Sequence, residues 1–369
     1  MKKQLLFLVL IILPLVASAH DIEVKNADGV TIYYNYTRNG TELVVTFRGG
    51  KYDTDPSEYT GNIVIPDEVS YLNITRKVTS IGEFAFRDCK NLTAVTIGNS
   101  VTSIGNYAFG YCFNLTSITI GNSVKYIDSY AFYSCTGLTS VTIPNSTIGI
   151  GSDAFRDCTN LSSITIGNNV TSIGIRAFSR CTGLTSVYIS NIEAWCNIDF
   201  GDQANSNPLL YAHHLYLNGE VIKNLIIPNS VRAIKKYAFY GCTDLISVTF
   251  SNSVTSIGNY AFASCDIAIV TSLIENPFTI TGKSTYDGSF SLNTFSNAIL
   301  YVPTGTINKY KATEGWKDFK NIVEGVPSGI KGVHLDNDKD YPIYDINGRR
   351  LEAPQRGINI INGKKVVIK

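Results

Sequence analysis

The sequence predicts an α/β repeat fold, mainly β, in which stacked units each supply one short strand and one short helical or 3₁₀ turn. One observation is a unit of twenty-three residues, clearest from Leu92 to Cys112 and restarting at Leu115. Another is an Ala-Phe-x-x-Cys signature that occurs seven times, with its alanine at Ala85, Ala108, Ala131, Ala154, Ala177, Ala238 and Ala261. A period of this length is typical of a solenoid, because one unit is too small to bury its own apolar face.

The opening of each unit predicts the strand. In LTAVTI the apolar residues Leu92, Val95 and Ile97 come to alternate with polar ones, which indicates a short strand with one buried face. Gly-Asn-Ser then forms a turn, and Gly105 lets the backbone bend again. The following Asn-Tyr-Ala-Phe is long enough for a single helical turn. We expect the apolar strand residues and the Ala-Phe-x-x-Cys side chains to face inward.

This unit resembles the leucine-rich repeat of the BspA-like bacterial surface proteins. The marks of that repeat are an L-x-x-[VI]-x-[IL] strand, a Pro or Gly after it, and an I-G-x-x-A-F-x-x-C turn. The resemblance covers residues 78–265 in seven copies. It implies a leucine-rich-repeat solenoid and adhesion to host proteins or neighbouring cells. A solenoid presents surfaces for binding, so the fold alone does not define the ligand.

Residues 1–19 are predicted to be a secretory signal peptide. A pair of lysines precedes an apolar run at residues 5–16, and Ala17-Ser18-Ala19 forms a small-residue cleavage site before His20. The apolar run is too short for a membrane span. We therefore expect a secreted protein, or one on the bacterial outer cell surface, without a transmembrane span in the mature chain.

The charge of the chain argues against nucleic acid as a partner. The formal net charge is +1, and removal of the two leader lysines makes it −1. Binding to phosphate groups requires a basic surface, which a near-neutral chain lacks.

The N-terminal end of the repeat is predicted to be closed by a β cap at residues 20–77. Strand-like runs at residues 30–36 and 43–48 predict a hairpin. The solenoid then occupies residues 78–265. Stacked repeats need caps because an open end exposes apolar side chains.

At the other end, residues 266–325 are predicted to form a degenerate repeat and a C-terminal cap. Residues 299–303 resemble one more repeat strand, and residues 306–321 predict an amphipathic helix that begins with a Thr306 cap.

Residues 326–369 are predicted to be a linker and a small C-terminal β segment. Apolar and polar residues alternate there around two Asn-Gly turns. The Tyr-Asp-x-x-Gly-Arg element at Tyr344 and the basic final strand resemble the end of the sorting domains of the type IX secretion route. This resemblance implies contact with the export machinery. A small solvated β tail is the alternative.

The repeat is interrupted by an irregular insertion at residues 190–223. The alanines Ala177 and Ala238 are sixty-one residues apart, which is two periods plus fifteen residues. Insertions in a solenoid emerge as loops on one face, and a tight hairpin around Asn218-Gly219 is expected here. Aromatic and histidine side chains make this segment a predicted ligand contact, or else they pack the insertion itself: Trp195, Phe200, Tyr211, His213 and Tyr216.

The sequence offers little catalytic or metal-binding chemistry. Seven of the eight cysteines share one repeat position. A parallel stack points their Cβ vectors the same way, so we expect buried thiols rather than disulfides. Cys196 with His213 and His214 is the one Cys/His grouping off this stack, which leaves a hydrolase site in the insertion as a remote alternative. We predict no enzyme, no metal and no cofactor.

The outward strand positions are rich in hydroxyl groups. They include Thr116, Ser117, Thr119, Thr139, Ser140 and Thr142. Such a row either keeps an exposed sheet soluble or forms a neutral, hydrogen-bonding surface for a partner. The sequence therefore favours non-covalent binding to an extracellular protein or glycan through the strand face and the insertion. A structural surface-layer or envelope protein without a specific soluble ligand is the alternative.

Overall fold

The computed structural model describes residues 20–26, 28–48, 59–284 and 287–325, and the backbone of four further strands between residues 343 and 368. The predicted signal peptide lies outside the described residues. The chain divides into two compact units, Met1–Val326 and Pro327–Lys369. Among the residues that the structure describes, no helix has the length and apolar character needed to cross a membrane.

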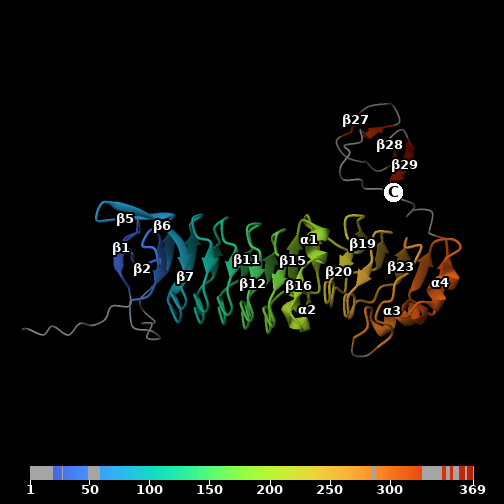
Figure 1. The fold of residues 1–369 in the computed structure, drawn as a ribbon, viewed down its shortest axis with the longest axis horizontal. Coiled ribbons are helices and arrows are strands. Elements are labelled where there is room, and N and C mark those ends of the chain that lie inside the picture. Colours follow the sequence, from blue (N-terminus) through green and yellow to red (C-terminus); the bar gives the residue numbers. More distant parts are fainter. Residues whose placement is uncertain are drawn as a thin grey trace, which may run out of the picture. The chain divides into compact units, whose positions relative to one another are not determined.

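The first unit is a solenoid in which most successive coils pair in parallel (Figure 1). The register advances by one repeat at each step, as where Ser140 pairs with Ser163 and Ser163 with Ser186. The long strands are β4 (Gly61–Ile65), β7 (Leu92–Ile97), β9 (Ser117–Thr119), β11 (Ser140–Thr142), β13 (Ser163–Thr165) and β15 (Ser186–Ile189), and later β19 (Asn224–Ile227), β21 (Ser247–Phe250), β23 (Ile269–Ser272), β24 (Ile299–Val302) and β25 (Asn321–Glu324).

Each regular coil also carries a second, two-residue strand. These short strands stack in parallel on another side of the coil: β8 (Ser103–Ile104), β10 (Tyr126–Ile127), β12 (Gly149–Ile150), β14 (Ser172–Ile173) and β16 (Asp199–Phe200), and separately β20 (Ala233–Ile234) and β22 (Ser256–Ile257). Two residues are too few to show alternation in the sequence, so the strand pattern predicts only the first strand of each unit.

The Ala-Phe-x-x-Cys segment forms a tight turn closed by hydrogen bonds between residues three apart. The Ala108 N–H donates to the Gly105 carbonyl, at 3.1 Å, and the Cys112 N–H to the Phe109 carbonyl, at 3.2 Å. Tyr107 and Tyr111 have φ angles of 51° and 64°. Left-handed residues at these two positions interrupt any continuous helix, so the predicted helical turn is short and sharply bent.

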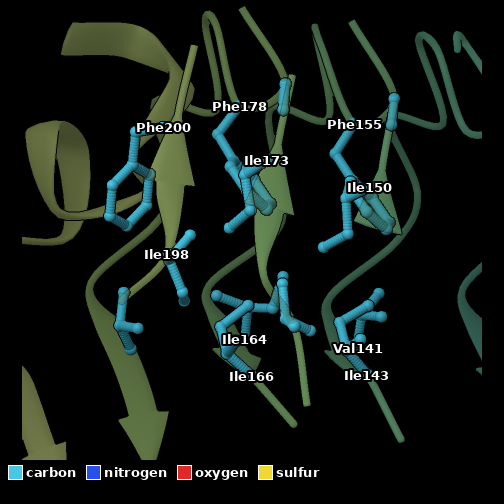
Figure 2. Packing of buried hydrophobic residues seen from close by; sticks show 14 of the residues in the cluster. Val141, Ile143, Ile150, Phe155, Ile164, Ile166, Ile173, Phe178, Ile198 and Phe200 are labelled. Carbon is cyan, nitrogen blue, oxygen red and sulfur yellow. The ribbon is translucent and has the colours of Figure 1, made fainter. Parts of the chain in front are cut away.

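The core is a stack of equivalent side chains from successive coils. Phe86, Phe109, Phe132, Phe155 and Phe178 stack with ring centroids 4.9–5.4 Å apart. Figure 2 shows Phe155 and Phe178 in this arrangement, with Ile150 and Ile173 of the short strands beside them. Burial of these residues requires the neighbouring coil, as expected for a repeat that cannot fold alone.

All eight cysteines are buried and none forms a disulfide, which confirms the prediction of unbridged thiols. In several coils the thiol donates to the carbonyl of the phenylalanine in the preceding coil, as it does at Cys112, Cys135, Cys158, Cys181 and Cys265. The Cys112 Sγ lies 2.9 Å from the Phe86 oxygen, and the Cys135 Sγ lies 3.0 Å from the Phe109 oxygen. The thiols thus act as small buried groups with a weak donor.

The N-terminal end contains β1 (Ile22–Lys25), β2 (Thr31–Tyr36) and β3 (Leu43–Thr46). The antiparallel pairing of β2 with β3 confirms the predicted hairpin. A second hairpin, β5 (Glu68–Tyr71) with β6 (Ile74–Ile81), leads into the first regular coil.

The C-terminal end contains α3 (Leu292–Asn297), α4 (Ile307–Ala312) and the 3₁₀ helix η2 (Trp316–Asp318). The prediction of one helix over residues 306–321 is wrong, because Gly315, with a φ of 82°, separates α4 from η2. Thr306 is the N-cap residue of α4, as predicted, but its hydroxyl donates to the Pro303 carbonyl and makes no capping bond to the helix. The Glu324 carboxylate instead accepts the N–H groups of Gly305 and Ile307, each at 3.0 Å.

The insertion forms an oversized coil followed by a hairpin. Twenty-eight residues separate the paired Val187 and Leu215, against twenty-three between Ile164 and Val187. This coil contains α1 (Ile192–Cys196), β16, the 3₁₀ helix η1 (Ala204–Ser206), α2 (Leu209–Ala212) and β17 (Leu215–Leu217). The antiparallel pairing of β17 with β18 (Glu220–Val221) confirms the predicted Asn-Gly hairpin.

The second unit contains a four-stranded antiparallel sheet in the order β27–β26–β28–β29. Its strands are β26 (Ile343–Asp345), β27 (Arg350–Leu351), β28 (Gly357–Ile361) and β29 (Lys364–Ile368). The two predicted Asn-Gly turns lie outside the described residues.

Candidate binding surfaces

The long strands β9 to β17 present a surface that we call the strand face. Among them, β11, β13, β15 and β17 pair within one sheet, and β9 lies beside β11 at the edge of the preceding three-stranded sheet. Parallel register aligns equivalent outward residues of successive coils into three rows. One row begins at Thr116, another at Ser117 and the third at Thr119. Because strands in a sheet lie about 4.8 Å apart, each row repeats a chemical group at that interval.

Most hydroxyls of the row that begins at Thr116 are engaged within the solenoid, whereas the exposed Thr139 hydroxyl has no hydrogen-bond partner among the described residues. The Thr116 hydroxyl donates to the Thr93 carbonyl at 3.1 Å, and the Ser162 hydroxyl donates to the Thr139 carbonyl at 2.9 Å. Thr185 makes the same bond to Ser162, at 3.1 Å. These three hydroxyls hold one coil to the next, so they are less available to a partner than the sequence suggests.

The other two rows carry exposed hydroxyls that have no hydrogen-bond partner among the described residues. They are Ser117, Thr119, Ser140 and Thr142, and all four lie on the strand face as predicted. Hydroxyl groups both donate and accept hydrogen bonds, so this part of the face can bind a partner's backbone or side-chain amides without charge.

Two stacked tyrosines end the third row. Tyr188 on β15 and Tyr216 on β17 are half-buried, with ring centroids 4.8 Å apart and planes at 25°. Tyr216 is a predicted contact residue, and Tyr188 was missed because it stands where the preceding coil has Thr165. Tyrosines give a large contact area at a low cost in side-chain entropy, so this pair is the strongest feature of the strand face.

Trp195 and Phe200 are not surface residues, which corrects their prediction as ligand contacts. Each is 1 % exposed, and their rings lie 5.4 Å apart within the core. Phe200 takes the place that Ile173 occupies in the preceding short strand, as Figure 2 shows. The larger loop has to fill the core that a regular coil fills with Phe and Ile, so its aromatic residues point inward.

Tyr211 and His213 hold the insertion to its neighbours. The Tyr211 oxygen accepts the Arg180 N–H at 2.9 Å, and the His213 Nδ1 lies 3.1 Å from the Gly241 carbonyl oxygen. His213 ends α2 with a φ of 62°. Both side chains therefore have structural contacts that a partner would have to replace.

The arrangement around Cys196 does not support a nucleophile. Cys196 is buried in the core, and burial raises the pKa of its thiol, with a smaller contribution from Glu193. The His214 Nδ1 pairs with the Asp244 carboxylate at 2.6 Å instead of facing this thiol. No group of three or more His, Cys, Asp or Glu residues suited to a metal ion occurs in the described part of the chain.

A cluster of aromatic rings lies on the turns and was not among the predicted contact residues; we call it the turn-face aromatic cluster. Tyr107 and Tyr130 stack with parallel planes, 4.5 Å between centroids, and Phe84 continues the stack at 5.7 Å. The Arg87 guanidinium lies 5.4–5.6 Å from the rings of Phe84, Tyr107 and Tyr111. The recurrence of an aromatic residue immediately before Ala-Phe is the sequence signal that would have revealed it.

The fold and these surfaces define a leucine-rich-repeat solenoid protein. The family model described as the BspA type leucine rich repeat region matches residues 66–195 and 213–309 in six copies, more than half of the 369-residue chain. The chain belongs to this family.

Several solved structures are similar to the chain. A leucine-rich repeat protein of T. pallidum is 24 % identical, covering 59 % of this chain and 82 % of its own, with a TM-score of 0.39. One from Bacteroides capillosus is 28 % identical, over 38 % of this chain and 96 % of its own, with a TM-score of 0.32. A leucine rich cell surface protein of Faecalibacterium prausnitzii is 20 % identical, over 84 % and 96 %, with a TM-score of 0.33. No curated protein matches.

Proposed function

We propose that the chain is a secreted or surface-displayed protein that binds an extracellular protein non-covalently through its strand face. The observation that carries this proposal is the stacked pair Tyr188 and Tyr216, which adjoins two rows of free hydroxyls. The predicted leader at residues 1–19 supports export. Membership of a repeat family whose fold presents long regular surfaces supports binding.

The chemistry of the strand face favours a protein partner. Tyrosine and serine together are typical of protein-recognition surfaces, in which the rings supply contact area and the hydroxyls supply adaptable hydrogen bonds. The free hydroxyl rows carry no charge, so electrostatic steering contributes little to association. Binding to the strand face should therefore depend only weakly on salt.

This proposal is tested by surface plasmon resonance with the mature chain, residues 20–369, over a panel of immobilised extracellular-matrix proteins. We expect saturable binding to at least one of them, with an affinity that changes little between low and high salt. A matched panel of matrix glycans is run in parallel.

The outcomes separate the alternatives. Saturable, salt-insensitive binding to a matrix protein supports the proposal. Binding that disappears at high salt contradicts the assignment to a neutral face. The absence of saturable binding to any protein in the panel contradicts the adhesive function.

A further inference from the structure

A pocket of about 360 Å³ opens on the turn side of the solenoid, near its C-terminal end. Its volume lies at the lower end of the range typical of small-molecule sites, which is roughly 300–1,000 Å³. Among the described residues that line it are Tyr240, Tyr260, Ala263, Ser264, Leu292 and Asn293.

The pocket exists because a stack of tyrosine rings ends there. Tyr237 and Tyr260 stack at 4.9 Å with planes at 13°. The bridge between Phe262 and Phe290 places Gly288 where the next ring of this stack would stand. The Tyr260 N–H donates to the Gly288 carbonyl at 3.1 Å, which confirms this alignment. Tyr237 therefore covers one face of the Tyr260 ring. The other face points toward Gly288 in the next coil, which has no side chain.

Gly288 cannot readily be replaced by a larger residue. A Cβ atom at this position would lie 2.9 Å from the Gly282 carbonyl oxygen and 3.1 Å from that of Phe290. Since both neighbours are backbone atoms, a side chain at position 288 would force the surrounding loop to shift, and among the described residues no ring follows Tyr260 in this stack.

Tyr240 forms a second wall of the pocket. Its ring meets that of Tyr260 edge to face, at 6.5 Å and 64°, so the two rings make a corner. In the next coil the position equivalent to Tyr240 is Ala263, whose small side chain leaves the corner open.

The polar groups of the pocket are neutral. The hydroxyls of Tyr240, Tyr260 and Ser264 have no hydrogen-bond partner among the described residues. The Asn293 amide adds N–H donors, while its oxygen already accepts from the Asn297 amide. None of the described lining residues carries a charge.

We propose that this pocket binds a single neutral sugar ring, either free or at the end of a glycan. A pyranose presents a face of C–H groups that packs on an aromatic ring, and a rim of hydroxyls that needs neutral donors and acceptors. The face of Tyr260 that points away from Tyr237 can pack against the C–H face of the sugar. The tyrosine and serine hydroxyls can bond to the sugar hydroxyls. A charged ligand would lack a counter-charge here, and an apolar ligand would leave the hydroxyls of the pocket without partners.

The test is saturation-transfer NMR and calorimetry with the full mature chain and the methyl pyranosides of glucose, galactose, mannose and N-acetylglucosamine. We expect at least one to bind saturably. Tyr260→Asn removes the ring and keeps a residue that tolerates a positive φ, and Ala263→Tyr fills the corner with the side chain found at Tyr240. Each should weaken binding by about tenfold or more, a loss in keeping with a removed ring contact.

Tyr130→Asn is the matched control, because it removes the equivalent ring of another coil and should leave sugar binding unchanged. Thermal unfolding of all variants checks that they remain folded, and Tyr260→Asn suffices if Ala263→Tyr does not fold. The proposal is overturned if no pyranoside binds saturably, if Tyr260→Asn binds as well as the natural chain, or if the pocket takes neutral tripeptides and no sugar. Protein binding by the strand face does not depend on these variants, so a failure here leaves that function standing.

Discussion

The indole Nε1–H of Trp195 donates to the carbonyl oxygen of Ala238 at 2.8 Å. In regular coils the equivalent alanine carbonyl accepts the phenylalanine N–H of the preceding coil, as where Phe239 donates to Ala261 at 2.8 Å. The insertion has no such phenylalanine. Trp195, together with the Asn207 amide at 3.1 Å, therefore supplies the donor that the interrupted repeat lacks.

The first prediction concerns this bond. Trp195→Phe keeps an aromatic ring in the core but removes the N–H, and should lower the free energy of unfolding by about 1–3 kcal/mol. Urea unfolding followed by circular dichroism measures the change. Thr142→Ser, at an exposed strand position, is the control and should stay within about 0.5 kcal/mol. Unchanged stability in Trp195→Phe, together with lost partner binding, would restore Trp195 as a ligand contact.

The second prediction concerns Gly315, in the turn between α4 and η2. A Cβ atom on Gly315 would lie 2.2 Å from the Ile280 carbonyl oxygen, and the φ of Gly315 is 82°. Gly305 has a similar φ of 84° but nothing within 4 Å of such a Cβ. Both Gly→Ala variants incur the backbone strain of about 1–2 kcal/mol. Gly315→Ala should cost a further 1–3 kcal/mol, roughly, because the core must shift.

Thermal unfolding of the two glycine variants side by side isolates the steric part of this cost. Equal losses of stability in Gly305→Ala and Gly315→Ala would contradict a steric cost from the close approach of Gly315 to Ile280.

The third prediction concerns pH. Burial raises the pKa of the Cys181 thiol from 9.0 to about 12. Above pH 9 the unfolded chain loses this proton while the folded chain keeps it, so the folded state binds more protons and stability falls as pH rises. The part of the unfolding free energy that depends on this thiol proton is fully present below pH 9 and is lost between pH 9 and about 12. Within that window it falls by about 1.4 kcal/mol per pH unit for one thiol.

Urea unfolding at a series of pH values between 9 and about 11 tests this linkage. Cys181→Ala should reduce the slope of the unfolding free energy against pH by the contribution of one proton, about 1.4 kcal/mol per pH unit. The neighbouring exposed variant Thr182→Ala should leave this slope unchanged. A slope that does not differ between Cys181→Ala and the natural chain would contradict the buried, protonated thiol.

The repeat period accounts for most of what the sequence predicts correctly. Equivalent residues of successive units contact one another, so a pattern seen once, such as Phe109 with Cys112, specifies the whole core. The role of Trp195 could not be predicted in this way, because its acceptor lies 43 residues away across an interrupted repeat. Without knowledge of that acceptor, an aromatic residue in an irregular loop is easily predicted to be a surface contact.

The pocket beside Tyr260 could not be predicted from the sequence for a related reason. It depends on the alignment of Gly288 with Tyr260, across a coil of twenty-eight residues between the bridged Phe262 and Phe290. That coil does not carry the repeat signature, so the absence of a ring at Gly288 is not visible until the coils are stacked.

The binding of the double variant Tyr188→Thr, Tyr216→Thr to the matrix protein identified in the panel tests the central claim most directly. Threonine is the residue that the preceding coil, at Thr165, already places in this row, so the fold should be retained. Tyr126→Ser, at an exposed tyrosine of the short-strand face, is the matched control. We predict that the double variant binds at least about tenfold more weakly while the control is unchanged. Equal binding by the natural chain and the double variant would show that the strand face is not the binding site.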